Sequence, residues 1–446
     1  MTQYFLSKRP TGVYYVDATF GDNDNTGLSP AQAWRSIAKV NSSTFEPGNQ
    51  ILFKRGETWS ERLIPPSSGS AAGYITFSSY GSGAAPIIDG TGVTIASGGL
   101  VHINNKDYIR VYGLNVIDSQ DFGIYAADSA YIDVQYNTTR NTESSGVGMW
   151  RCDRVWVTHN TVVNARCVTL ANGGHEESIS LAVTTNFEVA YNDVSMDGVE
   201  GYLGNEGIDC KEGTQHGSVH HNYVHGFWGE GGAIYVDAWD RATGDIDIYA
   251  NRCWGNPNGI AINSEQGGAV DDVNIYNNLV YNVYSAGIAI SDTGSDGLKS
   301  NINIYHNTVY KAQYNGGAAI YVKSANISDV SIINNITYFD RSNGQILVAV
   351  PSAVAHVTCH HNLSYGSTEV PMDAPLAVEL SENPAGYATV HDNLTGDPDF
   401  VSLVTPDLHI QATSPAIGAA YNLSLATDYD GVARTIPDIG AFESVA

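Results

Sequence analysis

One short motif recurs along most of this chain and limits the folds that it can adopt. In each copy a few β-forming residues lead to an asparagine, as in Val134–Asn137 and Ile304–Asn307. Successive asparagines are 23 to 32 residues apart, about 28 on average. A nearly constant period of this size indicates stacked repeats rather than the three or so domains usual for 446 residues. The repeating asparagines are Asn137, Asn160, Asn192, Asn222, Asn251, Asn278, Asn307, Asn335 and Asn362.

Each period also contains a second β segment, usually opened by Gly or Ala, such as Gly207–Lys211 or Ala233–Asp237. Short strands in coils of about 28 residues predict an all-β, right-handed parallel β-helix of about twelve coils. Leucine-rich repeats need a missing Leu framework, and propeller blades need ~40 residues. Only residues 30–40 favour a helix, which we expect to cap the N-terminal end. Asparagine tolerates the left-handed backbone conformation, so we place it in a turn and expect its side chains to hydrogen-bond along the stack.

The period ends at about Asp397, so we divide the chain there. Residues 1–396 are expected to form the catalytic β-helix with its N-terminal cap. Residues 397–446 are expected to form a C-terminal segment packed on the last coils. His159, His221, His306 and His361 directly precede repeat asparagines, which predicts that they are turn residues.

Composition and charge exclude several classes of protein. A net charge of -26, from 21 basic and 47 acidic residues, argues against nucleic-acid binding. No apolar stretch is long enough for a membrane span, and the five scattered cysteines predict neither disulfides nor zinc ligands. The N-terminus lacks an apolar signal region. We expect a secreted monomer, with its signal absent from this sequence, or a phage-borne one, and no organic cofactor.

Alternation of side chains along strands places Asp209, Lys211, Tyr235 and Asp237 on the outer side of adjacent coils. A lysine between acidic neighbours is unusual in a chain with so few basic residues. This patch is the candidate functional site. Flanking segments add further polar and aromatic candidates: Trp150, Arg166, His175, Glu177, Glu206, Glu212, His216, Trp239, Asp240, Arg241 and Glu265.

Several motifs resemble secreted bacterial β-helix proteins of the polysaccharide-lyase type. The central motifs Gly207–Gly213 and Ala233–Trp239 are similar to the active-site coils of β-helix alginate lyases. This resemblance implies degradation of a polysaccharide such as alginate. Opening and tail motifs extend the resemblance over nearly the whole chain: Tyr14–Ala18, Gly21–Gly27, Pro47–Ile51, Asp397–Phe400, Ser414–Ile417, Asp428–Gly431 and Asp438–Glu443.

The first hypothesis is therefore a lyase that cleaves a uronic-acid polymer by β-elimination in a groove along the β-helix. Lys211 would remove the C5 proton, Arg166 or Ca²⁺ would stabilise the enediolate, and Tyr235 or His175 would protonate the leaving oxygen. Neighbouring carboxylates raise the pKa of a lysine, which opposes its use as a base, whereas bound Ca²⁺ would remove that conflict. The calcium ligands would come from Glu177, Asp209 and Asp237. The expected substrate-binding residues are Trp150, Asp209, Asp237, Trp239, Arg241 and Glu265.

Two alternatives remain open. Asp209 and Asp237 lie one coil and two residues apart, a backbone separation of roughly 8 Å. This falls within the ~6.5–9.5 Å typical of inverting glycoside hydrolases. The other alternative is a non-catalytic carbohydrate-binding or virion adhesin β-helix. Its aromatic face would consist of Tyr125, Trp150, Tyr235 and Tyr321.

Overall fold

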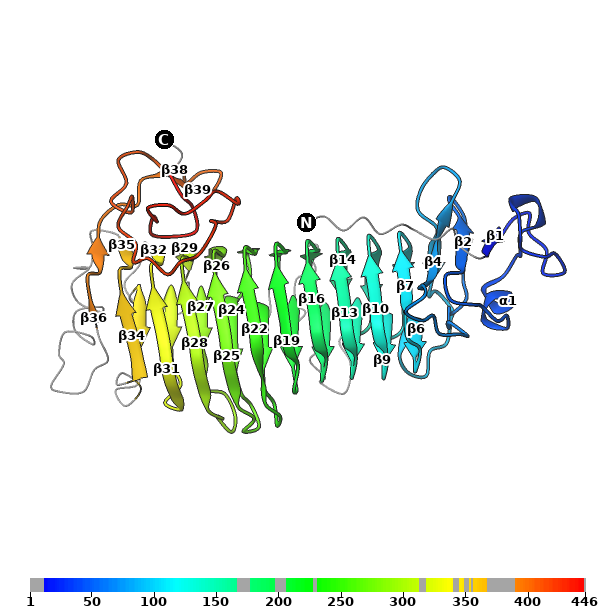
Figure 1. The fold of residues 1–446 in the computed structure, drawn as a ribbon, viewed down its shortest axis with the longest axis horizontal. Helices are drawn as coiled ribbons and strands as arrows, with labels where there is room; N and C mark the ends of the chain where they lie inside the picture. Colours follow the sequence, from blue (N-terminus) through cyan, green and yellow to red (C-terminus); the bar gives the residue numbers. More distant parts are fainter. Residues whose placement is uncertain are drawn as a thin grey trace. The chain divides into compact units, whose positions relative to one another are not determined.

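The computed structural model describes residues 12–166, 177–196, 206–227, 231–312, 318–339, 345–348, 353, 356–366 and 390–444. The chain divides into two units, Met1–Asn172 and Gly173–Ala446. In each unit, parallel strands stack into three sheets, one strand of each sheet per coil (Figure 1). Strand bounds follow for the first unit and then for the second.

In the first unit, the first sheet contains β1 (Val13–Val16), β2 (Gln50–Lys54), β4 (Ile75–Tyr80), β7 (Ile109–Tyr112), β10 (Ala130–Gln135) and β13 (Asp153–Thr158). The second sheet contains β3 (Thr58–Trp59), β5 (Ile87–Asp89), β8 (Asn115–Ile117), β11 (Thr138–Thr142) and β14 (Thr161–Ala165). The third sheet contains β6 (Gly99–Asn104), β9 (Phe122–Ala127) and β12 (Val147–Trp150).

In the second unit, the first sheet contains β16 (Thr185–Ala190), β19 (Gln215–His220), β22 (Thr243–Tyr249), β25 (Val270–Tyr276), β28 (Lys299–Tyr305), β31 (Ile327–Ile333), β34 (Val357–His360) and β36 (Val390–His391). The second sheet contains β17 (Asp193–Ser195), β20 (Tyr223–His225), β23 (Arg252–Trp254), β26 (Leu279–Val283), β29 (Thr308–Ala312), β32 (Ile336–Phe339), β35 (Leu363–Gly366) and β37 (Leu394–Thr395). The third sheet contains β15 (Ile179–Ala182), β18 (Ile208–Lys211), β21 (Gly232–Asp237), β24 (Asn258–Asn263), β27 (Ile288–Ile290), β30 (Ile320–Val322) and β33 (Ile346–Val348).

This arrangement is the expected right-handed parallel β-helix. The third sheets of the two units contain 10 described strands, so the number of turns is about ten, close to the expected twelve. Among the described residues, no helix is both long and apolar enough to cross a membrane.

The expected N-terminal helix over residues 30–40 is two short helices instead. A 3₁₀ helix, η1, covers Pro30–Gln32, and an α-helix, α1, covers Ile37–Asn41. Between them, Trp34 forms a parallel β-bridge with Val16, which pulls the chain into an extended conformation. The second helix then begins because the Ser36 side chain accepts a hydrogen bond from the Lys39 amide.

The interior of each coil is filled by β-branched side chains in register. In the third sheet of the second unit, Ile208, Ile234, Ile260, Ile288 and Ile320 align on consecutive strands, and all are fully buried. Burying each such side chain stabilises the fold by about 1.5–3 kcal/mol. Because strand side chains alternate, this inward row sends the neighbouring residues to the outer side of the sheet.

The asparagines form the expected ladder within each unit. Asn278, for example, donates through Nδ2 to Asn307 Oδ1 at 2.9 Å and to the Ile248 carbonyl at 2.8 Å. The ladder continues beyond the predicted set to Asn393, whose Oδ1 accepts from Asn362.

The expected left-handed conformation falls one residue earlier than predicted. In every coil the residue before the ladder asparagine has positive φ, and the asparagine itself does not. The bend at that preceding residue turns the asparagine side chain inward, where its amide bonds to main chain and ladder. The positive-φ residues include the four predicted turn histidines, His159, His221, His306 and His361, which confirms that prediction.

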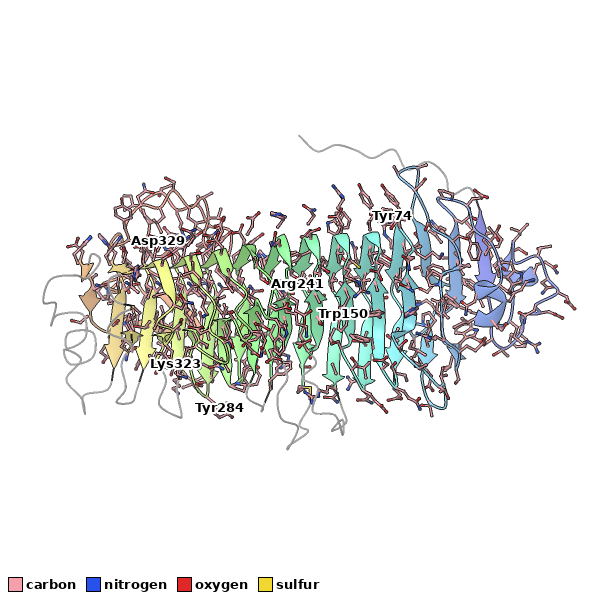
Figure 2. All side chains as sticks on the ribbon, turned by 90° about the horizontal axis from the view of Figure 1, so that it is seen from below. Tyr74, Trp150, Arg241, Tyr284, Lys323 and Asp329 are labelled. Carbon is pink, nitrogen blue, oxygen red and sulfur yellow. The ribbon has the colours of Figure 1, made fainter. Side chains whose placement is uncertain are left out.

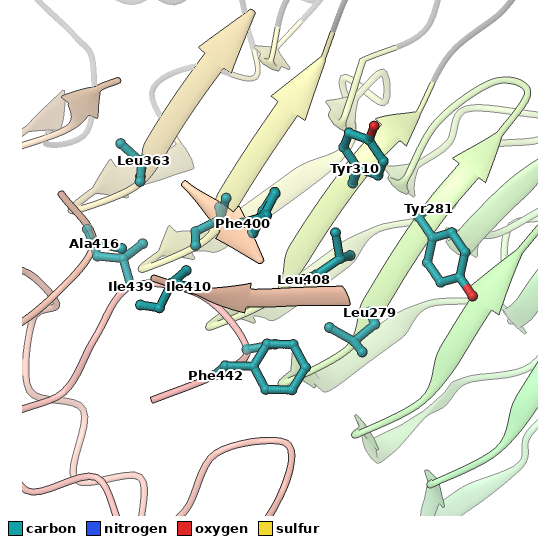
Figure 3. Close-up of a cluster of buried hydrophobic side chains, with 12 residues drawn as sticks. Leu279, Tyr281, Tyr310, Leu363, Phe400, Leu408, Ile410, Ala416, Ile439 and Phe442 are labelled. Atoms are coloured by element: carbon teal, nitrogen blue, oxygen red, sulfur yellow. The ribbon is translucent and has the colours of Figure 1, made fainter. Parts of the chain in front are cut away.

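The C-terminal segment packs on the second sheet of the second unit. An antiparallel pair, β38 (Phe400–Ser402) and β39 (Asp407–Ile410), brings Phe400 and Leu408 against Tyr310 and Leu363 (Figure 3). Hydrogen bonds also join later parts of the segment to the same coils, and two of them show how. The Gly440 amide donates to the Asn334 carbonyl at 2.8 Å, and the Ala441 amide to Thr308 Oγ1 at 3.0 Å.

Candidate functional site

The candidate site lies on the outer side of the third sheet of the second unit, across strands β15, β18, β21 and β24. The predicted register is confirmed: Asp209 pairs with Tyr235, and Lys211 pairs with Asp237. On the flanking strands Ser180 aligns with Asp209, and Asn263 aligns with Asp237. These chemically different side chains meet because two neighbouring coils place them at equivalent strand positions.

Lys211 is held between two carboxylates. Its ammonium donates to Glu177 Oε1 at 2.6 Å and lies 4.0 Å from Asp209 Oδ2. The Lys211 side chain is only 15% exposed. Burial alone would lower its pKa, but the charges of Glu177 and Asp209 outweigh burial and raise the pKa above its usual value. Lys211 is therefore a fixed cation in this arrangement.

Asp209 is the most deeply buried of the acids Asp209, Glu177 and Asp237. The residue is 2% exposed, and its Oδ1 atom has no hydrogen-bond partner among the described residues. Burial raises its pKa well above the usual value, and the neighbouring Glu177 charge raises it further. The neighbouring Ser178 hydroxyl is likewise buried without a partner. The site thus contains polar atoms available to hydrogen-bond a ligand or water.

Two further acids titrate closer to neutral pH. Burial raises the pKa of Asp237 to about 6. A hydrogen bond from the Trp239 amide at 2.9 Å acts in the opposite direction and lowers it. Burial and the Glu177 charge raise the pKa of Glu206 to about 7. Burial therefore raises the pKa of both Asp209 and Asp237 above the usual carboxyl value, as groups that transfer protons near neutral pH require.

The hydroxyl of Tyr235 makes two hydrogen bonds. It donates to Glu265 Oε1 at 2.9 Å and accepts from Asn263 Nδ2 at 2.7 Å. Burial raises its pKa, and the Glu265 charge adds to the effect, so the phenol stays protonated. Asn263 joins this network because strand register places it within reach of Tyr235. Its residue type alone does not mark it as a site residue in the sequence.

Other predicted residues lie at the edge of the cluster or outside it. Trp239 contributes its main-chain amide to Asp237, and its side chain is exposed. Arg241, which Figure 2 labels, is exposed, and its Nε lies 3.7 Å from Oδ1 of the adjacent Asp240. Arg166 and Trp150 belong to the first unit, so their predicted roles stay predictions. His175 lies outside the described residues.

The predicted aromatic face occurs as a separate cluster in each unit. In the first unit, Trp150 packs against Phe122 and Tyr125. In the second, Tyr235 and Tyr321 flank a buried set of small residues, Ala261, Ala286 and Ala289.

The three predicted calcium ligands, Glu177, Asp209 and Asp237, supply the hard oxygen donors that Ca²⁺ prefers. Lys211 Nζ is already bonded to Glu177, so a metal there would have to displace the ammonium. Within the described residues, the group of three ligand side chains brought within binding distance of one another lies elsewhere, at His361, His391 and Asp392. The calcium site therefore stays a prediction.

Comparisons with known proteins support the β-helix fold of the chain. No protein-family model matches it. A stretch of 134 residues is 31% identical to a lacto-N-biosidase of Bifidobacterium longum subsp. longum. That match covers 29% of this chain and only 8% of the relative.

Two solved structures resemble the chain over nearly its full length. XylC in complex with xylose has a TM-score of 0.63 at 11% identity and covers 97% of this chain and 98% of its own. Pectate lyase Pel9A has a TM-score of 0.55 at 16% identity and covers 97% and 96%. At these identities the likeness shows the shared β-helix fold.

Proposed function

We propose that this protein is an enzyme that cleaves a glycosidic bond by hydrolysis, with Asp209 and Asp237 as its acid and base. The observation that carries the proposal is their placement on adjacent strands with different environments. Asp209 is buried beside Glu177, and burial raises its pKa well above the usual value, as a proton donor needs. Asp237, with a pKa of about 6, is ionised at pH 7.

The separation of the two acids supports an inverting mechanism. Register places them one coil and two residues apart, roughly 8 Å between backbones. Carboxyl groups at a similar separation would leave room for a water molecule between Asp237 and the anomeric carbon. Asp237 would take a proton from that water while Asp209 protonates the departing oxygen. Lys211 would position both carboxyl groups and stabilise negative charge near them.

Similar proteins point to a carbohydrate substrate. The matching segment of lacto-N-biosidase and the fold of XylC bound to xylose both favour a neutral sugar. The test is product analysis on lacto-N-biosides, xylo-oligosaccharides, pectate and alginate. We expect saturated products with a new reducing end, and Asp237→Asn should abolish them without unfolding the protein. Unsaturated products would contradict hydrolysis.

A second candidate is the uronate lyase of the first hypothesis. The observation that favours it is Lys211, a cation on the outer face between two coils, in a fold shared with pectate lyase. The ion pair with Glu177 opposes it, because a base must first lose its proton. Calcium on Glu177 and Asp209 would free the lysine. This candidate therefore predicts unsaturated products whose formation stops with EDTA and returns with Ca²⁺.

A further inference from the structure

A second cluster of ligand-type side chains lies in the first sheet of the second unit, at its last coil. His361, His391 and Asp392 each place one ligand atom within 4.8 Å of the others. We propose that these three residues form a binding site for a divalent transition metal of the zinc type.

The cluster arises from the register of two consecutive coils. β34 pairs with β36, so His360 aligns with His391, and their rings stack at 4.7 Å. His361 and Asp392 follow at the next position, each directly before a ladder asparagine and each with positive φ. Two histidines from one coil therefore meet a histidine and an aspartate from the next.

The backbone beneath the cluster is fixed by the asparagine ladder. Asn362 donates through both its amide and its side chain to Asn393 Oδ1 at 3.0 Å. Asn393 in turn donates to the Cys359 carbonyl at 3.1 Å. A site whose backbone is held in this way loses less entropy when a metal orders its side chains.

The donor set suits zinc better than calcium. Two imidazoles and one carboxylate are typical zinc ligands, and three protein ligands leave a fourth position for water. His361 is half-buried, whereas His391 and Asp392 are exposed, so solvent can supply the ion and that water. Asp392 already lies within hydrogen-bond distance of His391, with 2.7 Å between Oδ2 of Asp392 and Nδ1 of His391.

The third histidine of the cluster is placed to orient a ligand. His360 is buried, and its Nδ1 lies 2.9 Å from Nδ1 of His361. Such a contact fixes the ring of a ligating histidine through its other nitrogen.

The same unit contains a natural control. His220 and His221 repeat the His360–His361 pair, with the same 2.9 Å contact between Nδ1 atoms. The next coil aligns Tyr249 with His220, and Ala250 follows it, so no ligand comes from that side. His221 also has positive φ, and replacing it by alanine imposes the same backbone strain as replacing His361.

The experiment measures zinc bound per chain, by elemental analysis after dialysis of the full-length protein against Zn²⁺, together with the melting temperature. We expect one zinc in wild type and in His221→Ala, and at least about tenfold weaker binding in His361→Ala, His391→Ala and Asp392→Asn. Zinc should raise the melting temperature only in the proteins that bind it.

Absence of bound zinc from wild type, or unchanged binding in both His391→Ala and Asp392→Asn, would overturn the proposal. Asp237→Asn serves as a further control, because it should lose carbohydrate cleavage and keep zinc. The two proposals therefore succeed or fail separately.

Discussion

Lys211 and Glu177 form an ion pair of 2.6 Å on the outer side of the β-helix, with both side chains largely shielded from water. This contact favours the proposed hydrolysis over proton abstraction by Lys211. A lysine held by a carboxylate remains protonated, so it serves better as a fixed positive charge than as a base. The acids around it, with their pKa values raised by burial, then become the groups that move protons.

The pH dependence of cleavage follows from Asp237. A base with a pKa of about 6 is ionised above that pH, so kcat/KM should rise with pH through about 6. Asp237→Asn should lower kcat by roughly 10²–10⁴-fold and remove this limb. Initial rates across the pH range check both expectations. A rise that persists with the same midpoint in the variant would show that another group is the base.

The stereochemistry of the product follows from the separation of Asp209 and Asp237. At roughly 8 Å between backbones the pair has room for water, so the new reducing end should have the opposite anomeric configuration to the substrate. Proton NMR recorded immediately after mixing distinguishes the anomers before they equilibrate. Retention of configuration would exclude the direct attack of water.

Stability should decrease as pH rises from about 4 to 7. Asp237 titrates near 3.8 in an unfolded chain and near 6 in the fold, so its neutral form stabilises the folded state at low pH. That stabilisation, about 3 kcal/mol, is lost as pH rises through 6. Asp209 and Glu206 act in the same direction. Urea unfolding of wild type and Asp237→Asn at several pH values should show a smaller pH dependence in the variant.

Removing Glu177 should cost far more stability than removing an exposed partner. Glu177→Gln leaves Lys211 in a poorly solvated position, and breaking such a pair costs about 3–5 kcal/mol. The matched control is Asp128→Asn, which breaks the exposed 2.6 Å pair with Arg151 and should cost less than about 1 kcal/mol. Equal shifts of the urea midpoint in the two variants would contradict the burial argument.

The asparagine ladder should be sensitive to loss of a single member. Asn278→Ala leaves the amides of Asn251 without their acceptor, and each unsatisfied buried group costs about 1–3 kcal/mol. Asn274 lies on the outer side of β25 and donates to Asp247 at 3.0 Å, so Asn274→Ala is the control. Thermal unfolding should show a larger loss for Asn278→Ala than for Asn274→Ala.

Much of this architecture is predictable from the sequence because the repeat fixes both coil length and strand register. The pairings of Asp209 with Tyr235 and of Lys211 with Asp237 follow from aligning the coils. The position of the left-handed residue does not, because Asn tolerates positive φ and also serves as an inward hydrogen-bonding side chain. In this fold the asparagine serves as the inward hydrogen-bonding side chain, and the residue before it takes the positive φ.

The protonation states at the site were harder to predict. The sequence placed Lys211 beside acids, but the rotamer that pairs it with Glu177 rather than Asp237 depends on side-chain packing. Likewise, the sequence prediction ended the ladder at Asn362 and did not include Asn393, so only the pairing of β34 with β36 brings His391 and Asp392 to His361.

Hydrolysis is tested most directly by running the reaction in water enriched in heavy oxygen and weighing the products by mass spectrometry. Hydrolysis should give saturated products that carry one heavy oxygen at the new reducing end, with or without EDTA. Unsaturated products without heavy oxygen would contradict it and assign Lys211 to β-elimination.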